Sequence, residues 1–116
     1  MSQRADRILI AGAGPVGLAA ANILADAGLP VTVFEAEPNL PETLRASTFQ
    51  PSTLDLLARL AVSKLLINMG LVAPRLQYRD RNGWIAEFDF GAIGDETQHP
   101  YRLQCEQFKL NRLLVD

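Results

Sequence analysis

Three closely spaced glycines constrain the fold of this chain more than any other feature. Residues 8–17 read ILIAGAGPVG, so a short apolar run is followed by Gly12, Gly14 and Gly17. The apolar run predicts a short buried strand, and Gly12 permits the tight turn that leaves it. Gly14 lets the backbone approach a pyrophosphate because no Cβ intervenes, and Gly17 lets the next helix lie close to the sheet. The pattern therefore predicts a dinucleotide site at a strand-to-helix turn.

The residues after the second glycine predict the start of that helix. Pro15 suits the first helical position because its φ is fixed and it has no N–H group. Val16 belongs to the first turn, whose free amides and positive dipole end would point at the phosphates. Apolar residues then recur at helical spacing as far as Ala25, and Gly28 predicts a left-handed cap.

A second strand and an acidic residue complete the unit. Residues 31–34 read VTVF, which predicts a fully buried parallel strand, and Glu35 follows directly. The fingerprint places a carboxylate here on the ribose hydroxyls of the dinucleotide, where it would repel a 2′-phosphate. The order strand, helix, strand predicts an α/β fold with a Rossmann-like βαβ unit. Two alternatives to a dinucleotide site stay open: the glycine turn binds no ligand, or Glu35 is only a solvated carboxylate at the end of a strand.

Composition limits the other possibilities. The 116 residues predict one small domain, with no second complete domain. Eleven basic and 13 acidic residues give a formal charge of −2, which argues against binding to nucleic acid or to an anionic membrane. Cys105 is the only cysteine, so no intrachain disulfide can form, a cysteine metal cluster is excluded, and a reducing cytoplasm is predicted. We expect Cys105 to be a small buried apolar residue and His99, the only histidine, to lie in a solvated turn.

The amino-terminal segment superficially resembles a signal peptide or a membrane span. Arg4 and Arg7 precede residues 8–25, which contain no charged residue. The three glycines and Pro15 divide that run into a strand and a helix, so we predict neither a targeting segment nor a membrane span.

The middle of the chain predicts two helices and a hairpin. A helix should begin at Pro51, with an apolar stripe of Leu54, Leu57, Ala58 and Ala61, and Ser63 should cap a second helix that runs through Met69 to Gly70. Residues 76–79 and 84–90 flank Asn82-Gly83, a strong signal for an antiparallel hairpin. We interpret its aromatic residues as packing residues rather than a binding platform; they are Tyr78, Trp84, Phe88 and Phe90. A polar loop over residues 91–100 and a helix over residues 104–115 should follow.

Beyond these patterns, the chain resembles the amino-terminal part of the class A flavoprotein monooxygenases, the aromatic hydroxylases related to para-hydroxybenzoate hydroxylase. The resemblance spans nearly the whole chain. It rests on Gly12 to Gly17 and Glu35, and on Arg45-Ala followed by the helix that starts at Pro51. It also rests on Gln107, with Arg112 five positions later, which looks like the glutamine helix of that family.

The resemblance implies a cofactor, a co-substrate and a substrate class. Arg45 would lie over the FAD pyrophosphate and Gln107 would touch the cofactor from another direction. NAD(P)H would be the co-substrate, a small aromatic compound would be hydroxylated, and the hairpin over about 75–91 would belong to the substrate region. The family's later Asp-Gly and Gly-Asp motifs are not found in this sequence, which therefore looks like an incomplete piece of the family fold.

Two other functions stay open at the level of sequence. An NAD-binding dehydrogenase module would use Glu35 on its ribose equally well, although the hairpin after the second strand argues against it. The second open possibility is a non-catalytic fragment that binds a nucleotide weakly or not at all. No residue is assigned as a catalytic acid or base, and no metal ligand is predicted.

Overall fold

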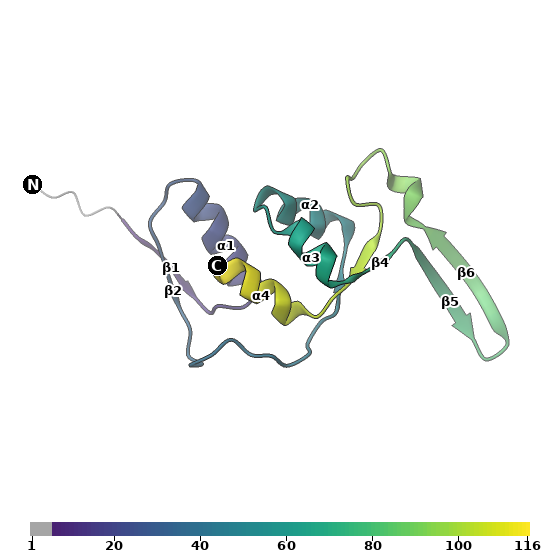
Figure 1. The fold of residues 1–116 in the computed structure, drawn as a ribbon, viewed down its shortest axis with the longest axis horizontal. Coiled ribbons are helices and arrows are strands. Elements are labelled where there is room, and N and C mark those ends of the chain that lie inside the picture. Colours follow the sequence, from purple (N-terminus) through teal and green to yellow (C-terminus); the bar gives the residue numbers. More distant parts are fainter. Residues whose placement is uncertain (1–5) are drawn as a thin grey trace, which may run out of the picture. The chain divides into compact units, whose positions relative to one another are not determined.

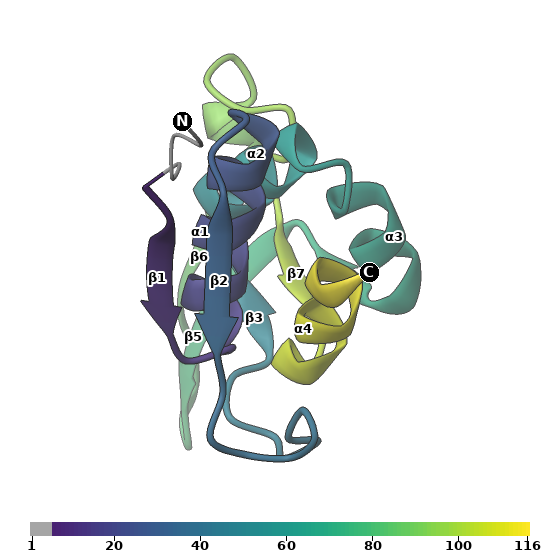
Figure 2. The same cartoon turned by 90° about the vertical axis from the view of Figure 1, so that its left-hand side faces the viewer.

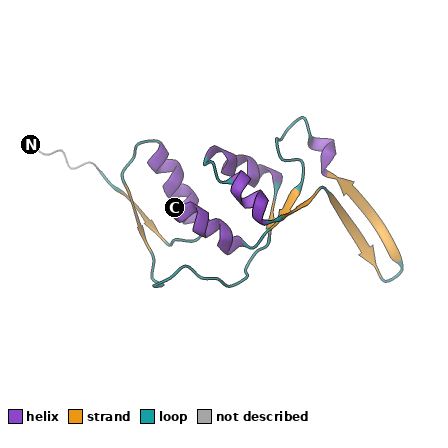
Figure 3. Ribbon diagram, viewed as in Figure 1, coloured by secondary structure: helices purple, strands orange, loops and turns teal. Residues whose placement is uncertain are grey.

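The computed structural model describes residues 6–116, so Arg4 lies outside the described part. The chain divides into two compact units, which we describe separately. The first contains the chain up to Arg45 together with Gln107–Asp116, and the second is Ala46–Glu106. Figure 1 and Figure 3 show the helices and strands of each unit.

The first unit is built on the predicted strand, helix, strand sequence. Strand β1 is Ile8–Ala11, helix α1 is Pro15–Asp26 and strand β2 is Val31–Phe34. The strands are parallel, with Ile8 opposite Val31 and Ala11 opposite Phe34 (Figure 2). Gly28 follows α1 with a φ of +81°, as a left-handed cap requires. The α/β fold with a βαβ unit is confirmed.

The strands are not fully buried, and that part of the prediction is wrong for the described residues. Leu9 is 65% exposed and Phe34 is 57% exposed. The physical reason is that β1 and β2 form a sheet of two strands, so each has a free edge and no layer covers their outer face.

Helix α4, Gln107–Val115, packs against α1 in the same unit. The side chain of Asn22 joins them, because its Nδ2 donates to Leu18 O at 2.8 Å and to Leu114 O at 2.9 Å. Sequence periodicity predicted a helix from residue 104, which is three residues too early. Residues 102–104 form a strand instead, because they pair with two strands that lie far away in the sequence.

The second unit has a small antiparallel sheet beside two helices. Its strands are β3 (Thr48–Phe49), β7 (Arg102–Gln104) and β4 (Leu71–Ala73), with β7 in the middle. Helix α2 is Pro51–Arg59 and helix α3 is Ser63–Met69. Four leucines are essentially inaccessible and form the core: Leu54, Leu57, Leu66 and Leu103. The helices were predicted from sequence, whereas the three short strands were not.

The junction between α2 and α3 differs from the predicted cap. Ser63 is the first residue of α3 and makes no side-chain cap, since the N-cap position is Val62. Ala61, expected in the apolar stripe of α2, instead follows that helix with a φ of +61°. Its N–H donates to Ala58 O at 3.1 Å and that of Val62 donates to Leu57 O at 3.2 Å, which is a Schellman motif with alanine in the usual glycine position.

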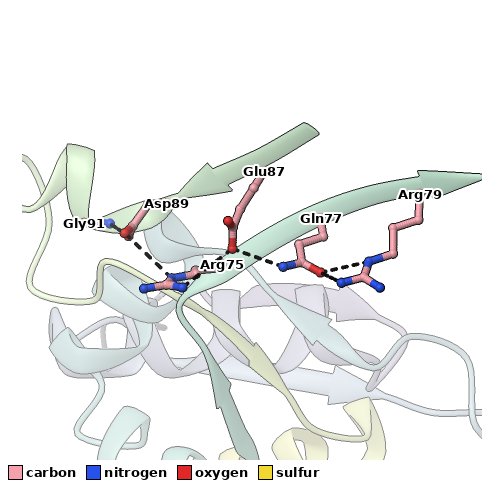
Figure 4. A network of polar contacts seen from close by, with 6 residues as sticks. All are labelled: Arg75, Gln77, Arg79, Glu87, Asp89 and Gly91. Carbon is pink, nitrogen blue, oxygen red and sulfur yellow. Dashed lines mark hydrogen bonds and ion pairs between the residues drawn. The ribbon is translucent and has the colours of Figure 1, made fainter. Parts of the chain in front are cut away.

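The predicted hairpin is present, with a turn one residue earlier than expected. Strand β5 is Arg75–Asp80 and strand β6 is Gly83–Asp89, so Arg81 and Asn82 form the turn. One face carries a polar network that includes Arg75, Gln77, Arg79, Glu87 and Asp89 (Figure 4). A short 3-10 helix, Phe90–Ile93, follows.

The aromatic residues of the hairpin include one packed pair, although the rings are largely exposed. Tyr78 and Phe88 contact each other edge to face, with ring centroids 6.0 Å apart, yet they are 54% and 57% exposed. Trp84 is 60% exposed. The edge-to-face pair agrees with the packing role expected for Tyr78 and Phe88, and the rings stay exposed because a two-stranded hairpin has no second layer to cover them.

His99 also departs from expectation, since it is buried rather than solvated. Only 9% of the residue is exposed, and its Nδ1 lies 2.5 Å from Asp55 Oδ1 on α2. The Thr97 hydroxyl lies within hydrogen-bond distance of both Asp55 oxygens, at 2.8 and 2.6 Å. These contacts, that of Thr97 first and that of His99 second, lower the pKa of Asp55 from its ordinary value. Cys105 is buried as predicted, at 3% exposed.

None of the helices in residues 6–116 is long and apolar enough to cross a membrane.

We expect Asp55 to make stability depend on pH. Because its pKa is lower in the folded chain than in the unfolded one, its contribution is complete above the unfolded pKa and is lost as pH falls through the folded pKa. The Asp55→Asn variant should therefore melt at a lower temperature at neutral pH, and the difference from the wild type should shrink under acid. Thermal unfolding followed by circular dichroism from about pH 7 to about pH 3 measures this. Asp26→Asn, which removes an exposed carboxyl at the end of α1, is the control for the loss of one acidic group.

Ala61→Gly should stabilise the second unit. A non-glycine residue in the left-handed region costs about 1–2 kcal/mol, and the greater freedom of glycine in the unfolded chain offsets about 0.5–1 kcal/mol of the gain. The net effect should be a small rise in melting temperature. A lower melting temperature would show that the alanine methyl makes packing contacts worth more than the backbone strain.

Candidate cofactor-binding site

The glycine turn leaves open space where a ligand would approach. Gly12 has a φ of +105°, a conformation that other residues adopt at a cost, so the turn itself requires glycine. A Cβ placed on Gly12 or on Gly14 would meet no atom within 4 Å. Gly14 has an extended backbone, with a φ of −79° and a ψ of −175°, so its lack of a side chain is not needed for the turn. That open space is what a closely approaching pyrophosphate would use.

Gly17 has a different role from the other two glycines. A Cβ at this position would lie 2.1 Å from Gly12 O and 3.2 Å from Gly12 C. No side chain can be accommodated there without moving the backbone of the turn. The helix thus lies close to the end of β1, as predicted for Gly17, since the same Cβ would also lie 3.4 Å from Ile10 Cγ2 on that strand.

The start of α1 provides unpaired donors. Gly14 is the N-cap and makes no side-chain cap, and Pro15 is the first residue of the helix. The first hydrogen bond of the helix runs from Leu18 N to Gly14 O at 2.9 Å. The amides that precede Leu18 in the first turn of α1 therefore have no partner within the helix. Val16 is 81% exposed, and the first turn contains no acidic residue. This end of α1 is suited to an anionic group.

Glu35 lies beside the glycine turn. Its Oε2 accepts a hydrogen bond from Ala13 N at 2.7 Å, and its Oε1 accepts one from Glu37 N at 3.2 Å. These bonds, that of Ala13 first, lower the pKa of the Glu35 carboxyl from its ordinary value, so the group stays ionised at neutral pH. Each carboxylate oxygen keeps a lone pair for another donor, such as a ribose hydroxyl.

The contact between Glu35 and Ala13 was not predicted from sequence. The fingerprint gives the separation between the glycines and the carboxylate, but not the atom that the carboxylate touches in the protein. Parallel pairing of the two strands is the signal that places them together, because it brings the residues that follow β1 and β2 to the same edge of the sheet.

Arg45 and Gln107 are less closely tied to this turn. Arg45 is exposed at the end of an irregular segment that follows β2, and Gln107 is the partly buried first residue of α4. Within residues 6–116, the structure records no hydrogen bond or ion pair for either side chain. No recorded contact brings either side chain to Gly12, Gly14 or Glu35, so their roles stay predictions.

An unpredicted ion pair joins the segment that carries Arg45 to α4. Arg112 on α4 donates to Glu42 Oε1, and its guanidinium lies 5.3 Å from the centre of the Phe108 ring. Both side chains of the pair are largely exposed. From sequence, Arg112 was noted only as part of a helix that resembles the glutamine helix of the family. The ion pair could not be predicted, because nothing in the local pattern identifies an acidic partner 70 positions away.

These residues fit a flavin adenine dinucleotide in charge and in shape. The open space at Gly12 and Gly14 would admit a diphosphate, the first turn of α1 offers amide donors, and Glu35 offers an acceptor at the adjoining strand end. A carboxylate there disfavours a nucleotide with a 2′-phosphate, because two anionic groups would meet.

Comparison with known proteins identifies the family. Residues 6–116 match the family described as FAD binding domain, and the chain therefore belongs to it. This confirms the resemblance to flavin monooxygenases seen in the sequence, and FAD is the cofactor of this domain.

Two relatives that the chain matches are monooxygenases. The chain is 34% identical over 110 residues to a para-nitrophenol 4-monooxygenase of a Pseudomonas species, covering 94% of the chain and 27% of that protein. It is 33% identical over 111 residues to a 6-hydroxy-3-succinoylpyridine 3-monooxygenase of Pseudomonas putida, covering 95% of the chain and 28% of that protein. The chain thus spans little more than a quarter of the length of these curated relatives.

Solved structures agree with this assignment. A crystal structure of p-nitrophenol 4-monooxygenase from Pseudomonas putida superposes with a TM-score of 0.86 and 31% identity, over 95% of this chain and 29% of that one. Aklavinone-11 hydroxylase, solved as a ternary complex with FAD and aklavinone, gives a TM-score of 0.79 at 25% identity, over 99% of this chain and 24% of that one.

The different roles of Gly14 and Gly17 can be separated by mutation. Gly14→Val should leave the melting temperature nearly unchanged, because the backbone is extended and the space is open, but it should abolish FAD binding by filling that space. Gly17→Ala should lower the melting temperature itself, because its Cβ would overlap Gly12 O. Thermal unfolding and a flavin-fluorescence titration of both variants measure the two effects. FAD binding retained by Gly14→Val would contradict the close approach.

Proposed function

We propose that this chain is the FAD-binding part of an NAD(P)H-dependent monooxygenase that hydroxylates a small aromatic compound. The observation that carries the proposal is the match of residues 6–116 to the FAD binding domain family, in a chain whose glycine turn is open and flanked by an ionised Glu35. The names of the relatives support the activity and the substrate class, since they are monooxygenases of a nitrophenol and of a hydroxypyridine.

The described residues can bind and orient the cofactor. The amides at the start of α1 donate to the diphosphate, and Glu35 accepts from the adenosine ribose. Arg45, a planar cation, adds a bidentate contact to phosphate oxygens, and the Gln107 amide, with both donor and acceptor atoms, contacts the cofactor from α4. The flavin, when bound and reduced, supplies the reaction with molecular oxygen.

Several finer parts of this proposal come from the resemblance and from composition. The hairpin of β5 and β6, with its exposed aromatic rings, is the part of the chain that we assign to the substrate region. NAD(P)H is the proposed reductant. A cytoplasmic location is proposed because the single cysteine suits a reducing compartment.

The dehydrogenase alternative is not favoured by any observation. A dehydrogenase module would continue from β2 into a third parallel strand. Here the next strand is β3, which pairs antiparallel with β7. Both strands belong to the Ala46–Glu106 unit and not to the unit of β1 and β2.

Titration with FAD and with NAD tests the proposed cofactor. The purified chain should bind FAD saturably, with quenched flavin fluorescence and a raised melting temperature, because a ligand that binds only the folded state stabilises it. NAD should produce neither effect at the same concentration. Saturable NAD binding without FAD binding would overturn the proposal, and binding of neither would leave the non-catalytic alternative as the description of this chain.

Glu35→Ala should weaken FAD binding about tenfold or more, which is typical for loss of a hydrogen bond to a charged group. Glu37→Ala is a matched control, since Glu37 is an exposed carboxylate two positions away whose backbone, not its side chain, contacts Glu35. Isothermal titration calorimetry of both variants measures the difference. Equal affinities for FAD would remove Glu35 from the site.

A further inference from the structure

A cavity lies in the Ala46–Glu106 unit, among residues that the candidate cofactor site does not use. Its volume is about 410 Å³, within the range of small-molecule sites. The end of α2, the start of α3 and the loop before β7 line it, through Ala58, Ala61, Ser63, Lys64, Gln98 and His99. None of these residues belongs to the glycine turn, to the segment of Arg45 or to α4.

The imidazole at this cavity is held in place by other residues. His99 is 9% exposed, and Asp55 Oδ1 lies 2.5 Å from its Nδ1. Thr97 contacts both oxygens of the same carboxylate and accepts a hydrogen bond from His99 N at 3.0 Å. Since Nδ1 faces the carboxylate, Nε2 is the ring nitrogen left for another partner. A side chain fixed in this way is typical of binding sites, where groups must be preorganised.

The charges of the lining favour an anion. Lys64 supplies an ammonium group, and no lining residue is acidic. The Asp55 carboxylate behind the lining contacts His99 and Thr97, so Lys64 is the charged group of the lining that a ligand in the cavity would meet. Ser63 adds a hydroxyl and Gln98 adds an amide, which can both donate to an oxygen.

The remaining wall is apolar and small. Ala58 and Ala61 present methyl groups, and Ala61 retains its methyl at a backbone position where glycine is usual. A ligand with one carboxylate and a compact apolar body would match both halves of the lining.

We propose that this cavity is a binding site for a small organic carboxylate. Lys64 forms an ion pair with the carboxylate, Ser63 and Gln98 donate hydrogen bonds, His99 provides a fixed polar contact, and the two alanines contact the apolar body. The site is separate from the flavin site and does not depend on the proposed function.

Benzoate is a suitable probe and benzamide is its neutral counterpart. Titration of the isotope-labelled chain should give saturable NMR shifts at the amides of Ala61, Ser63 and His99 with benzoate. Benzamide, which has the same shape without the charge, should bind up to about fivefold more weakly, since that is the upper range for one partly exposed ion pair. Equal shifts with the two compounds, or benzoate shifts that do not saturate, would overturn the proposal.

Two substitutions test whether benzoate binds at this cavity. Lys64→Gln should weaken benzoate binding about fivefold, whereas Arg81→Gln, which removes the same charge in the hairpin turn, should leave it unchanged. Lys64 is exposed, so its variant should keep the native amide spectrum and the FAD affinity of the wild type. Equal weakening by the two variants would show a general charge effect and would contradict a site at this cavity. A failure of FAD binding in the wild type would bear on the proposed function alone.

Discussion

The parallel pairing of β1 with β2 is the interaction on which the candidate cofactor site depends. It continues one residue past the strands, through the hydrogen bond of 2.6 Å from Gly12 N to Phe34 O. Glu35 then lies beside Ala13 and accepts its amide proton. The same pairing therefore sets the turn that would bind a diphosphate and the carboxylate that would bind the adjoining sugar. A shift in the register of these strands would separate the two.

The parts of the fold that were predicted correctly depend on local physics. Pro15, the positive φ of Gly28 and the hairpin signal of Asn82-Gly83 act over a few residues, so they can be read directly from the sequence, although the turn lies one residue earlier than that signal indicates. The small sheet could not be predicted in this way. Strand β3 has two residues and is stabilised by β7, which lies more than 50 positions away, and neither strand is long enough to show a period of two.

The candidate site also combines features that the local sequence predicts with features that depend on residues far away in the sequence. The open space at Gly14 and the position of Glu35 followed from a known spacing, whereas the Ala13 contact and the Glu42–Arg112 pair follow from tertiary structure. His99 is the clearest case. Its neighbour Pro100 indicated a solvated loop, but its environment is set by Asp55, 44 positions earlier, and a carboxylate on α2 gives no local sign of that partner.

The position of Gln107 illustrates how two segments that are far apart in the sequence meet in one compact unit. Its helix follows the whole Ala46–Glu106 unit in sequence, yet it belongs to the same compact unit as the glycine turn. Asn22 joins α1 to the end of α4, and Arg112 joins α4 to the segment that leads to Arg45. Neither contact involves the glutamine itself. The placement of Gln107 in the unit that contains the glycine turn is therefore a consequence of helix packing, and changes at Asn22 or Arg112 would act on it only through α4.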